Sequence, residues 1–495
     1  MPKFTFLVAT ATLAAIALPA QAQMTIPTDM AATCMVEPAR FASWFTSGTP
    51  GANAPVNPVS SVTFTTDNSA DNGPNVCNFY QWGAQMFMWL TSPEGDGIVL
   101  DGPSIFTVTP TGPDGKRTLI PNTTGATYQL SLRGGKTDDI GEVGQAGSNG
   151  VLLSQQGALV YYGIHANDVY GYFLSGQMTG AFPDAKDFPR NAEDLKEVLA
   201  YAGATYGVDI PNPQALAIEM KTSWVDAATL PSPEGYVTIE AEIPIFTPSS
   251  DNLTWQQATT APLTKTATMA LVGIHIVGTV QDHPEFVWAT FEHISNAPDA
   301  GYYYTKADDT VAMHPFSSDG SFAFMATGGT EADANKQCMR QCGATIVAAN
   351  DCSAEPAAIC QGGIVASDTV RNYPWGSAAN DQSAAVLKNN TLLLSVNNSV
   401  RSQMVAGDLR ANYVQTGGIW TTTPSAGADA PIPNWTGDQS ANLRGSLHLS
   451  NATMETYTQG TSCFSCHNLR PGDADSFVPF GLSHIFSTIN PLVKY

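Results

Sequence analysis

Charge is scarce in this sequence, and positive charge is the scarcest. Charged residues make up 13% of the 495 residues, and 21 Lys and Arg stand against 43 Asp and Glu, so the formal net charge is −22. A chain this acidic repels nucleic acid and anionic membrane surfaces, so both are poor partners and we expect no nucleic-acid binding. Turn-forming residues are abundant instead, with 43 Gly and 33 Pro. That composition is typical of an exported, loop-rich protein that contains β-structure, and the acidity helps to keep such a protein in solution.

Long hydrophobic runs are missing after residue 22. A transmembrane helix needs about 18 apolar residues in succession, and no later stretch approaches that length, so we expect no membrane span in the mature chain. Residues 1–22 carry Lys3, an apolar run and the final triplet Ala20-Gln21-Ala22. This combination is typical of a secretory signal peptide. The sequence therefore predicts a periplasmic or secreted protein whose mature chain begins at Gln23.

Cysteine and histidine are also few, yet five consecutive residues near the C-terminus combine them. The run Cys463-Phe464-Ser465-Cys466-His467 has the Cys-x-x-Cys-His pattern to which c-type haem is attached. Two thiols at this spacing on one helical turn can bond the two vinyl groups of a single porphyrin, and the histidine that follows can bind the iron. We expect one covalent haem c on Cys463 and Cys466, with His467 as the proximal iron ligand.

Two other chemistries use a similar pair of cysteines. A zinc site would need a second pair of cysteines or histidines nearby, and a thioredoxin-like redox motif would follow a strand of a βαβ unit. The sequence around residues 463–467 shows neither context. Export also favours haem, because covalent haem attachment takes place outside the bacterial cytoplasm.

Methionine is absent after the motif, although in small cytochromes c a downstream methionine completes the coordination of the iron. The sixth ligand must then come from elsewhere, or the position is open. The candidates are His484, His448, Met454, His275 and His293. A second histidine generally gives a lower potential than methionine, whereas an open position binds peroxide, oxygen or another small ligand.

His484 is the leading candidate for the sixth ligand. Pro471 and Gly472 lie between it and the motif, and such a pair can reverse the chain. In the competing interpretation, residues 481–486 start a short helix that packs its apolar side chains on the haem edge while His484 faces water.

The cysteines outside the motif are Cys34, Cys77, Cys338, Cys342, Cys352 and Cys360. In an oxidising compartment an even number favours disulfides, and the cluster at residues 338–360 is expected to be a disulfide-stapled loop. A metal cluster is the alternative for that group, but its spacing matches no zinc pattern and no histidine lies within it. The pairing itself cannot be deduced from the sequence.

Helical and strand patterns are interleaved without regular βαβ alternation. Residues 77–90 are aromatic and free of proline, which is typical of a buried helix, and residues 191–204 have the spacing of a surface helix. Residues 380–403 predict one long helix or two short ones, and residues 451–460 a helix that leads into the motif. Strands are predicted at 237–243, 269–280, 286–293 and 413–420, and a hairpin at 150–162.

The runs 269–280 and 286–293 are expected to be antiparallel neighbours, and they hold the best polar group outside the motif. His275 lies in the first run, while Glu292 and His293 end the second. One interpretation is a buried histidine that is hydrogen-bonded to a carboxylate and fixes the pairing of the strands. The other makes one of these groups the second iron ligand or an acid–base group over the haem.

Three segments and the haem motif together resemble a family of large exported bacterial cytochrome c-family proteins with a single haem. The segments are residues 288–298, 413–420 and 452–457. The likeness is scattered over residues 77–495, and only the haem motif is specific by itself. The resemblance implies that the two motif cysteines carry the haem and that His467 is the proximal ligand; it implies no substrate.

The expected fold class is α+β. A β-rich main body at residues 23–363, which includes the stapled loop at 338–360, closes over a mainly helical c-type haem module at residues 364–495. The expected function is periplasmic electron transfer or redox catalysis, with a redox partner protein or a small-molecule substrate. The alternatives are a haem enzyme of peroxidase or oxygenase type with an open iron site, and a nonenzymatic haem-based sensor or binding protein.

Overall fold

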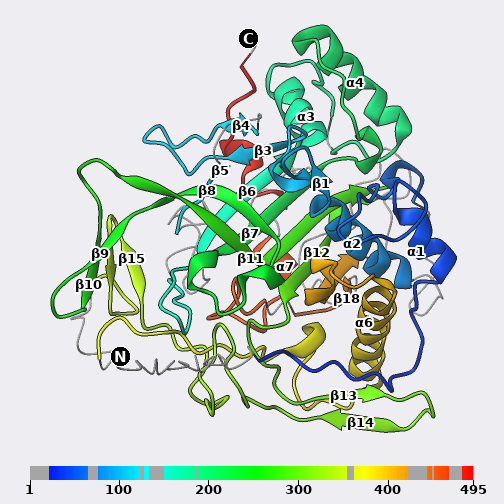
Figure 1. The fold of residues 1–495 in the computed structure, drawn as a ribbon. Coiled ribbons are helices and arrows are strands. Elements are labelled where there is room, and N and C mark those ends of the chain that lie inside the picture. Colours follow the sequence, from blue (N-terminus) through cyan, green and yellow to red (C-terminus); the bar gives the residue numbers. More distant parts are fainter. Residues whose placement is uncertain are drawn as a thin grey trace, which may run out of the picture.

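A large, mostly antiparallel sheet organises the chain in the computed structural model (Figure 1). The signal-peptide prediction falls on residues 1–22, of which only Ala22 is described. The structure describes residues 22–64, 76–122, 128–132, 150–185, 187–281, 283–353, 362–421, 443–448, 451–467 and 482–493.

The helices and strands are distributed along the whole chain. The helices are α1 (Pro38–Trp44), α2 (Val76–Leu90), α3 (Asp168–Met178), α4 (Ala192–Tyr206), α6 (Ala384–Gln403) and α7 (Cys463–Cys466). The strands up to the middle of the chain are β1 (Pro93–Glu94), β2 (Gly97–Ile98), β3 (Ile105–Val108), β4 (Leu119–Pro121), β5 (Tyr128–Gln129), β6 (Tyr161–Asn167), β7 (Ile218–Asp226), β8 (Thr238–Pro244), β9 (Phe246–Pro248) and β10 (Thr254–Gln257). The later strands are β11 (Thr264–Val280), β12 (His283–His293), β13 (Tyr302–Thr305), β14 (Val311–His314), β15 (Arg340–Cys342), β16 (Thr345–Val347), β17 (Tyr413–Thr421) and β18 (Leu443–Gly445).

β11 is the longest of these strands and the centre of the main sheet. The strand order is β18-β17-β12-β11-β7-β6-β3-β4, with β8 also paired to β11 and β5 parallel to β8. Along one edge of β11, residues 264–270 pair with β8 and residues 273–280 pair with β12, while β7 occupies the other edge. The strands expected at 269–280 and 286–293 are therefore confirmed as antiparallel neighbours.

One face of the main sheet, the helical face, packs against α1, α2 and α6. Phe87 of α2 stacks on Phe291 of β12, with the ring centroids 4.5 Å apart. A Cβ at Gly83 would lie 2.8 Å from the Cβ of Ala289, so glycine allows the helix to approach the strand this closely. The buried helix expected at 77–90 is confirmed, and residues 384–403 form the single helix α6.

The opposite face, the C-terminal face, packs against α3, α4 and residues 451–467 and 482–489. Alternation along β11 determines which side chains reach which face. Ile274 and Ile276 belong to the apolar cluster under the helices, whereas Val277 belongs to the cluster that contains Cys463 and Phe464. His275, two residues before Val277, therefore also faces the C-terminal segment.

The expectation of a mainly helical C-terminal module is wrong. α6 packs with α2 on the helical face, and β17 continues the main sheet by pairing with β12. Residues 451–460, which were expected to be helical, form successive turns. Local patterns predicted the strand at 413–420, but its partner lies more than a hundred residues earlier, and such non-local pairing leaves no trace in local periodicity.

Among the cysteines that the structure describes, two pairs lie at disulfide distance. Cys34 is joined to Cys77 at the start of α2, and Cys342 is joined to Cys352, with Cα atoms 5.4 and 5.7 Å apart, respectively. The second bridge lies within the 338–360 segment, beside the small sheet β15-β16-β10-β9. Cys360 lies outside the described residues.

The helices that the structure describes include none that is both long enough and apolar enough to cross a membrane.

Candidate functional site

The Cys-x-x-Cys-His motif lies on the C-terminal face of the main sheet. Cys463 and Phe464 are buried in an apolar cluster that also contains Trp288 of β12 and Ile419 of β17. α7 is a single helical turn, closed by the His467 backbone N–H, which donates to the Cys463 carbonyl at 2.8 Å. Figure 1 shows α7 among the central strands. The motif is therefore held against the sheet.

His467 is oriented by a backbone carbonyl and an indole ring. Its Nδ1 lies 2.7 Å from the Leu482 carbonyl oxygen. Because a carbonyl can only accept, Nδ1 carries the hydrogen, and in the neutral ring the lone pair is then on Nε2. The Trp288 ring lies against the imidazole, with centroids 4.5 Å apart and planes tilted by 58°. Metal-binding histidines typically have their other ring nitrogen fixed in this way.

His484 lies directly on His467. The two rings stack with centroids 3.8 Å apart and planes 13° apart, so the fold brings residue 484 back to His467. Two imidazoles that bind one metal from opposite sides have centroids on the order of 6 Å apart, since each metal–nitrogen bond is about 2 Å. The stacked arrangement is therefore closer than joint ligation requires, and a shared iron would require the two rings to separate.

The residues around His484 follow the competing interpretation in part. Leu482, Ile485 and Phe486 are buried in the same apolar cluster as Cys463. His484 itself is partly exposed. The segment thus packs its apolar side chains inward and also places His484 on His467.

Residues 451–456, just before the motif, are hydrogen-bonded to β7 and β12. Asn451 donates to the Thr290 hydroxyl of β12 at 3.0 Å, and the Thr453 and Ser223 hydroxyls are 2.7 Å apart. The Ala452 backbone N–H donates to the Glu292 carboxylate at 2.7 Å. These bonds explain the absence of a regular helix, because side chains and backbone of successive residues are turned toward the sheet.

His275 is paired with Glu455 of this segment. Its Nε2 lies 2.6 Å from a Glu455 carboxylate oxygen, and the Glu455 backbone lies 180 residues away along the chain. Burial alone would raise the pKa of Glu455, but the imidazole, by its charge and its hydrogen bond, and nearby Lys221 hold that pKa below its usual range. A carboxylate bond to His275 was expected, but the partner is Glu455, whereas the expected Glu292 lies across from Gly273.

Glu292 belongs to a separate buried ion-pair group. The Arg371 guanidinium contacts Glu292 at 3.0 Å and Asp299 at 2.6 Å, and all three side chains are buried. Burial raises the pKa of Glu292, and the charge of Arg371 acts against that rise. The group positions the carboxylate that receives the Ala452 N–H.

The remaining candidates for the sixth ligand have other contacts. His293 stacks on Tyr236 with the ring centroids 3.6 Å apart and also meets the ring of Tyr413. His448 Nδ1 donates to the Gly460 carbonyl at 2.7 Å. Met454 is fully buried among Ala270 and Val272.

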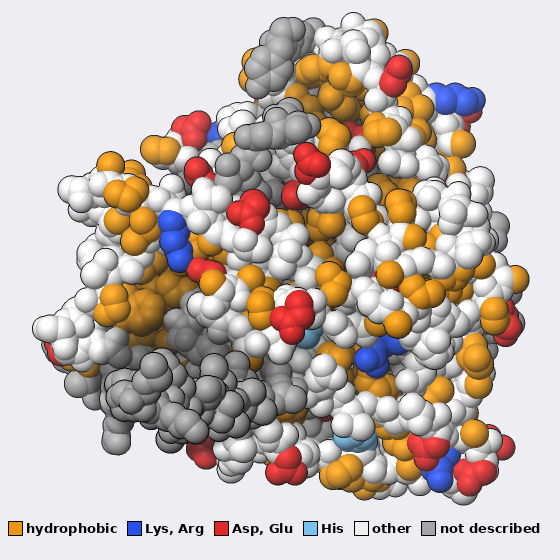
Figure 2. Space-filling view, in the orientation of Figure 1, with side chains coloured by type: hydrophobic (Ala, Val, Ile, Leu, Met, Phe, Trp, Pro, Cys, Tyr) orange, Lys and Arg blue, Asp and Glu red, His pale blue; other side chains and the backbone are white. Residues whose placement is uncertain are grey.

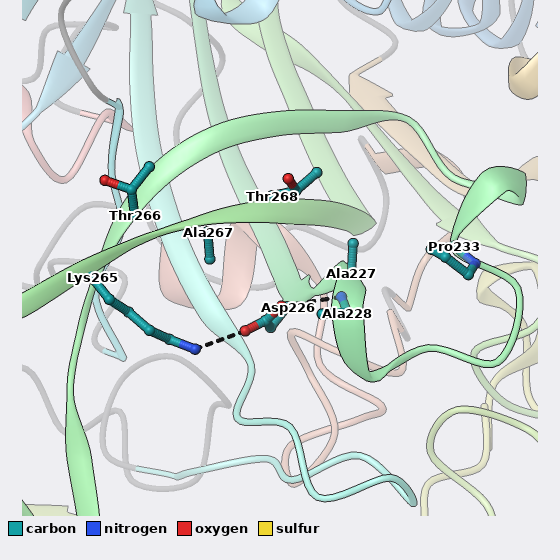
Figure 3. Close-up of a pocket in the computed structure, with 8 residues that line it drawn as sticks. All are labelled: Asp226, Ala227, Ala228, Pro233, Lys265, Thr266, Ala267 and Thr268. Atoms are coloured by element: carbon teal, nitrogen blue, oxygen red, sulfur yellow. Dashed lines mark hydrogen bonds and ion pairs between the residues drawn. The ribbon is translucent and has the colours of Figure 1, made fainter.

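An open pocket of about 480 Å³ lies where β7 ends and β11 begins (Figure 3). Asp226 and Lys265 form an ion pair of 2.8 Å across it. The pocket contains no residue of the haem motif. Its charges compensate one another, and a partly exposed pair of this kind contributes little to stability.

The surface carries few charged groups. Figure 2 shows uncharged and hydrophobic atoms over most of one face, with acidic side chains scattered among them.

Within the described part of the chain, no group of three or more His, Cys, Asp or Glu side chains is placed to hold a metal ion.

Sequence reasoning missed Glu455, Leu482, Glu219 and Ser483. Glu455 is an isolated carboxylate in an otherwise uncharged run just before the motif, which was an available signal. Leu482 acts through its backbone, which no sequence pattern distinguishes. Glu219 and Ser483 hydrogen-bond to each other across 264 residues, and only the packing brings them together.

No family model matches this chain, and neither does a curated protein or a solved structure.

Proposed function

We propose that this protein is a periplasmic c-type cytochrome that carries one covalent haem c on Cys463 and Cys466. His467 binds the iron, and the protein takes part in electron transfer or redox catalysis with a redox protein or a small-molecule substrate. The bound haem would supply reversible one-electron chemistry. The chain supplies the attachment thiols, the iron ligand and the surrounding apolar wall.

The observation that carries this proposal is the environment of His467. The residue that the motif assigns to the iron has its Nδ1–H fixed by the Leu482 carbonyl at 2.7 Å. Trp288 and Phe464 form an aromatic wall beside it, with their ring centroids 5.8 Å apart. A fixed tautomer in an apolar setting suits a haem-binding histidine.

The alternative function is a haem enzyme of peroxidase or oxygenase type, or a haem-based sensor, with an open iron position. The close stack of His467 and His484 favours it, because His484 is not in a ligating arrangement while the rings are in contact. Low-spin iron in both redox states supports the carrier. High-spin iron that binds CO or peroxide supports the enzyme or sensor, and turnover separates those two.

The attachment is tested by expression with the c-type maturation machinery. The protein should retain haem after denaturing electrophoresis, and Cys463→Ser combined with Cys466→Ser should abolish that retention. The matched control is Cys342→Ser with Cys352→Ser, which removes two cysteines elsewhere and should leave the haem attached. Haem that extracts freely into acid organic solvent from the unmutated protein would contradict the proposal.

A further inference from the structure

Leu482 and His484 both contact His467, the proposed iron ligand. The Leu482 carbonyl accepts the His467 Nδ1–H, and His484 stacks on the His467 ring. Ser483 lies between these two contacts and is buried. Whatever holds Ser483 therefore affects the orientation of His467 and the place of His484.

Ser483 is held by a directed chain of hydrogen bonds. Its hydroxyl lies 2.5 Å from a Glu219 carboxylate oxygen of β7 and 2.8 Å from the Tyr170 hydroxyl of α3. An ionised carboxylate only accepts, so Ser483 donates to Glu219. The Ser483 oxygen then accepts from Tyr170. Burial and the nearby Glu219 charge raise the pKa of Tyr170 well above its ordinary value, which keeps the donating proton on the phenol.

The other end of the same segment is also fixed. The Arg117 backbone N–H donates to the Thr488 carbonyl at 2.8 Å, and its carbonyl accepts from Asn490 at 2.9 Å. The Lys116 ammonium donates to the Ser487 carbonyl at 3.2 Å. Residues 487–490 are thus fixed to the residues just before β4. At the other end of the segment, next to His484, the Ser483 hydroxyl makes the hydrogen bond to the sheet.

We infer that Glu219, acting through Ser483, is a positioning residue for the axial-ligand segment 482–484. The inference rests on the proposed haem function. It adds a carboxylate that acts on the histidine segment through its hydrogen bond with Ser483. Outer-shell hydrogen bonds orient metal-binding histidines and tune the metal. Loss of the Ser483 bond should also shift the haem potential, because hydrogen bonds around an iron ligand tune it.

The test compares Ser483→Ala and Glu219→Leu with the unmutated holoprotein. Both variants should keep haem on a denaturing gel, because the attachment thiols are intact. Their ratio of low-spin to high-spin iron should fall, because a loosened segment positions its histidines less well, and their midpoint potential should shift. Ser487→Ala is the matched control, since its side chain is exposed on the same segment; it should change neither quantity.

Conservative variants separate positioning from general damage. Ser483→Thr keeps the hydroxyl and Glu219→Gln keeps an oxygen acceptor, so both should recover most of the spin-state ratio, with thermal unfolding confirming that each variant is folded. Spectra and potentials of Ser483→Ala and Glu219→Leu that equal those of Ser487→Ala would overturn the inference. A folded Glu219→Gln whose spin-state ratio is as low as that of Glu219→Leu would also overturn it. The denaturing gel of the unmutated protein is run before the variants are compared. If that protein carries no covalent haem, the proposed function and this inference are both overturned.

Discussion

At the scale of single residues, His484 decides which chemistry the proposed haem can perform. It stacks face to face on His467 with centroids 3.8 Å apart, and it is partly exposed while its apolar neighbours are buried. The His484 side chain is less buried than those of Leu482 and Ile485. His484 can therefore serve as a sixth ligand only through a local movement.

We expect His484→Ala to convert a low-spin spectrum to high-spin and to open the iron to CO. The reason is that no methionine follows the motif to take its place. Optical spectra of both redox states with and without CO measure the effect, and His314→Ala, on the β13–β14 hairpin, is the control. An unchanged spectrum would eliminate His484 and direct attention to His275 and Met454.

At the scale of elements, the contact between β11 and residues 451–456 holds the motif against the sheet. Gly273 allows this contact, because a Cβ there would lie 2.6 Å from the Thr453 hydroxyl and 2.8 Å from the Ser223 hydroxyl. Neither hydroxyl is on a flexible chain, and each is the hydrogen-bond partner of the other. Glycine at this position leaves the room that these side chains occupy.

Gly273→Ala should lower the free energy of unfolding by about 1–3 kcal/mol, the usual cost of inserting a methyl group into a packed interior. Denaturant titration measures it. Gly203→Ala in α4 is the matched control: a Cβ there would lie 3.9 Å from the Val208 carbonyl oxygen, so that substitution should stabilise the helix by about 1 kcal/mol. Equal stability of Gly273→Ala and the unmutated protein would show that the segment does not pack this closely on β11.

At the scale of the whole molecule, buried titratable groups make stability depend on pH. Burial lowers the pKa of His165 and of His293 to about 3 in each case. Both are neutral in the folded protein and become protonated more readily when it unfolds, so each contributes to a loss of stability as the pH falls from 6.5 toward 3. Asp168 has the opposite pH dependence. Burial raises its pKa to about 7, so its contribution to the free energy of unfolding is lost as the pH rises from 3.8 toward 7.

His165→Gln should become more stable relative to the unmutated protein as the pH falls below 6.5. The difference should change by about 1.4 kcal/mol for each pH unit down to about 4, because the variant lacks the penalty for keeping this imidazole neutral. Unfolding free energies at pH 8, 6 and 4.5 measure it. Ile164→Val on the same strand, β6, removes no titrating group, and its smaller cost should be the same at every pH. A pH-independent effect of His165→Gln would contradict the assignment.

Several features of this protein follow from the sequence alone because they depend only on neighbouring residues. The Cys463–His467 motif requires fixed spacing within one helical turn, and the buried helix at 77–90 is visible in its unbroken aromatic run. The strands at 269–280 and 286–293 are apolar and joined by a short turn, so their antiparallel pairing was predictable and is present.

The tertiary structure decided the partners of these elements. His275 meets Glu455 rather than Glu292, across 180 residues, and β17 joins the main sheet instead of a helical module. Leu482 fixes His467 through a backbone carbonyl, a group that every residue has. Periodicity and spacing indicate which face of its own helix or strand a residue occupies. They do not indicate which distant residue packs against that face. The partner depends on how distant segments pack when both faces of the sheet are buried together.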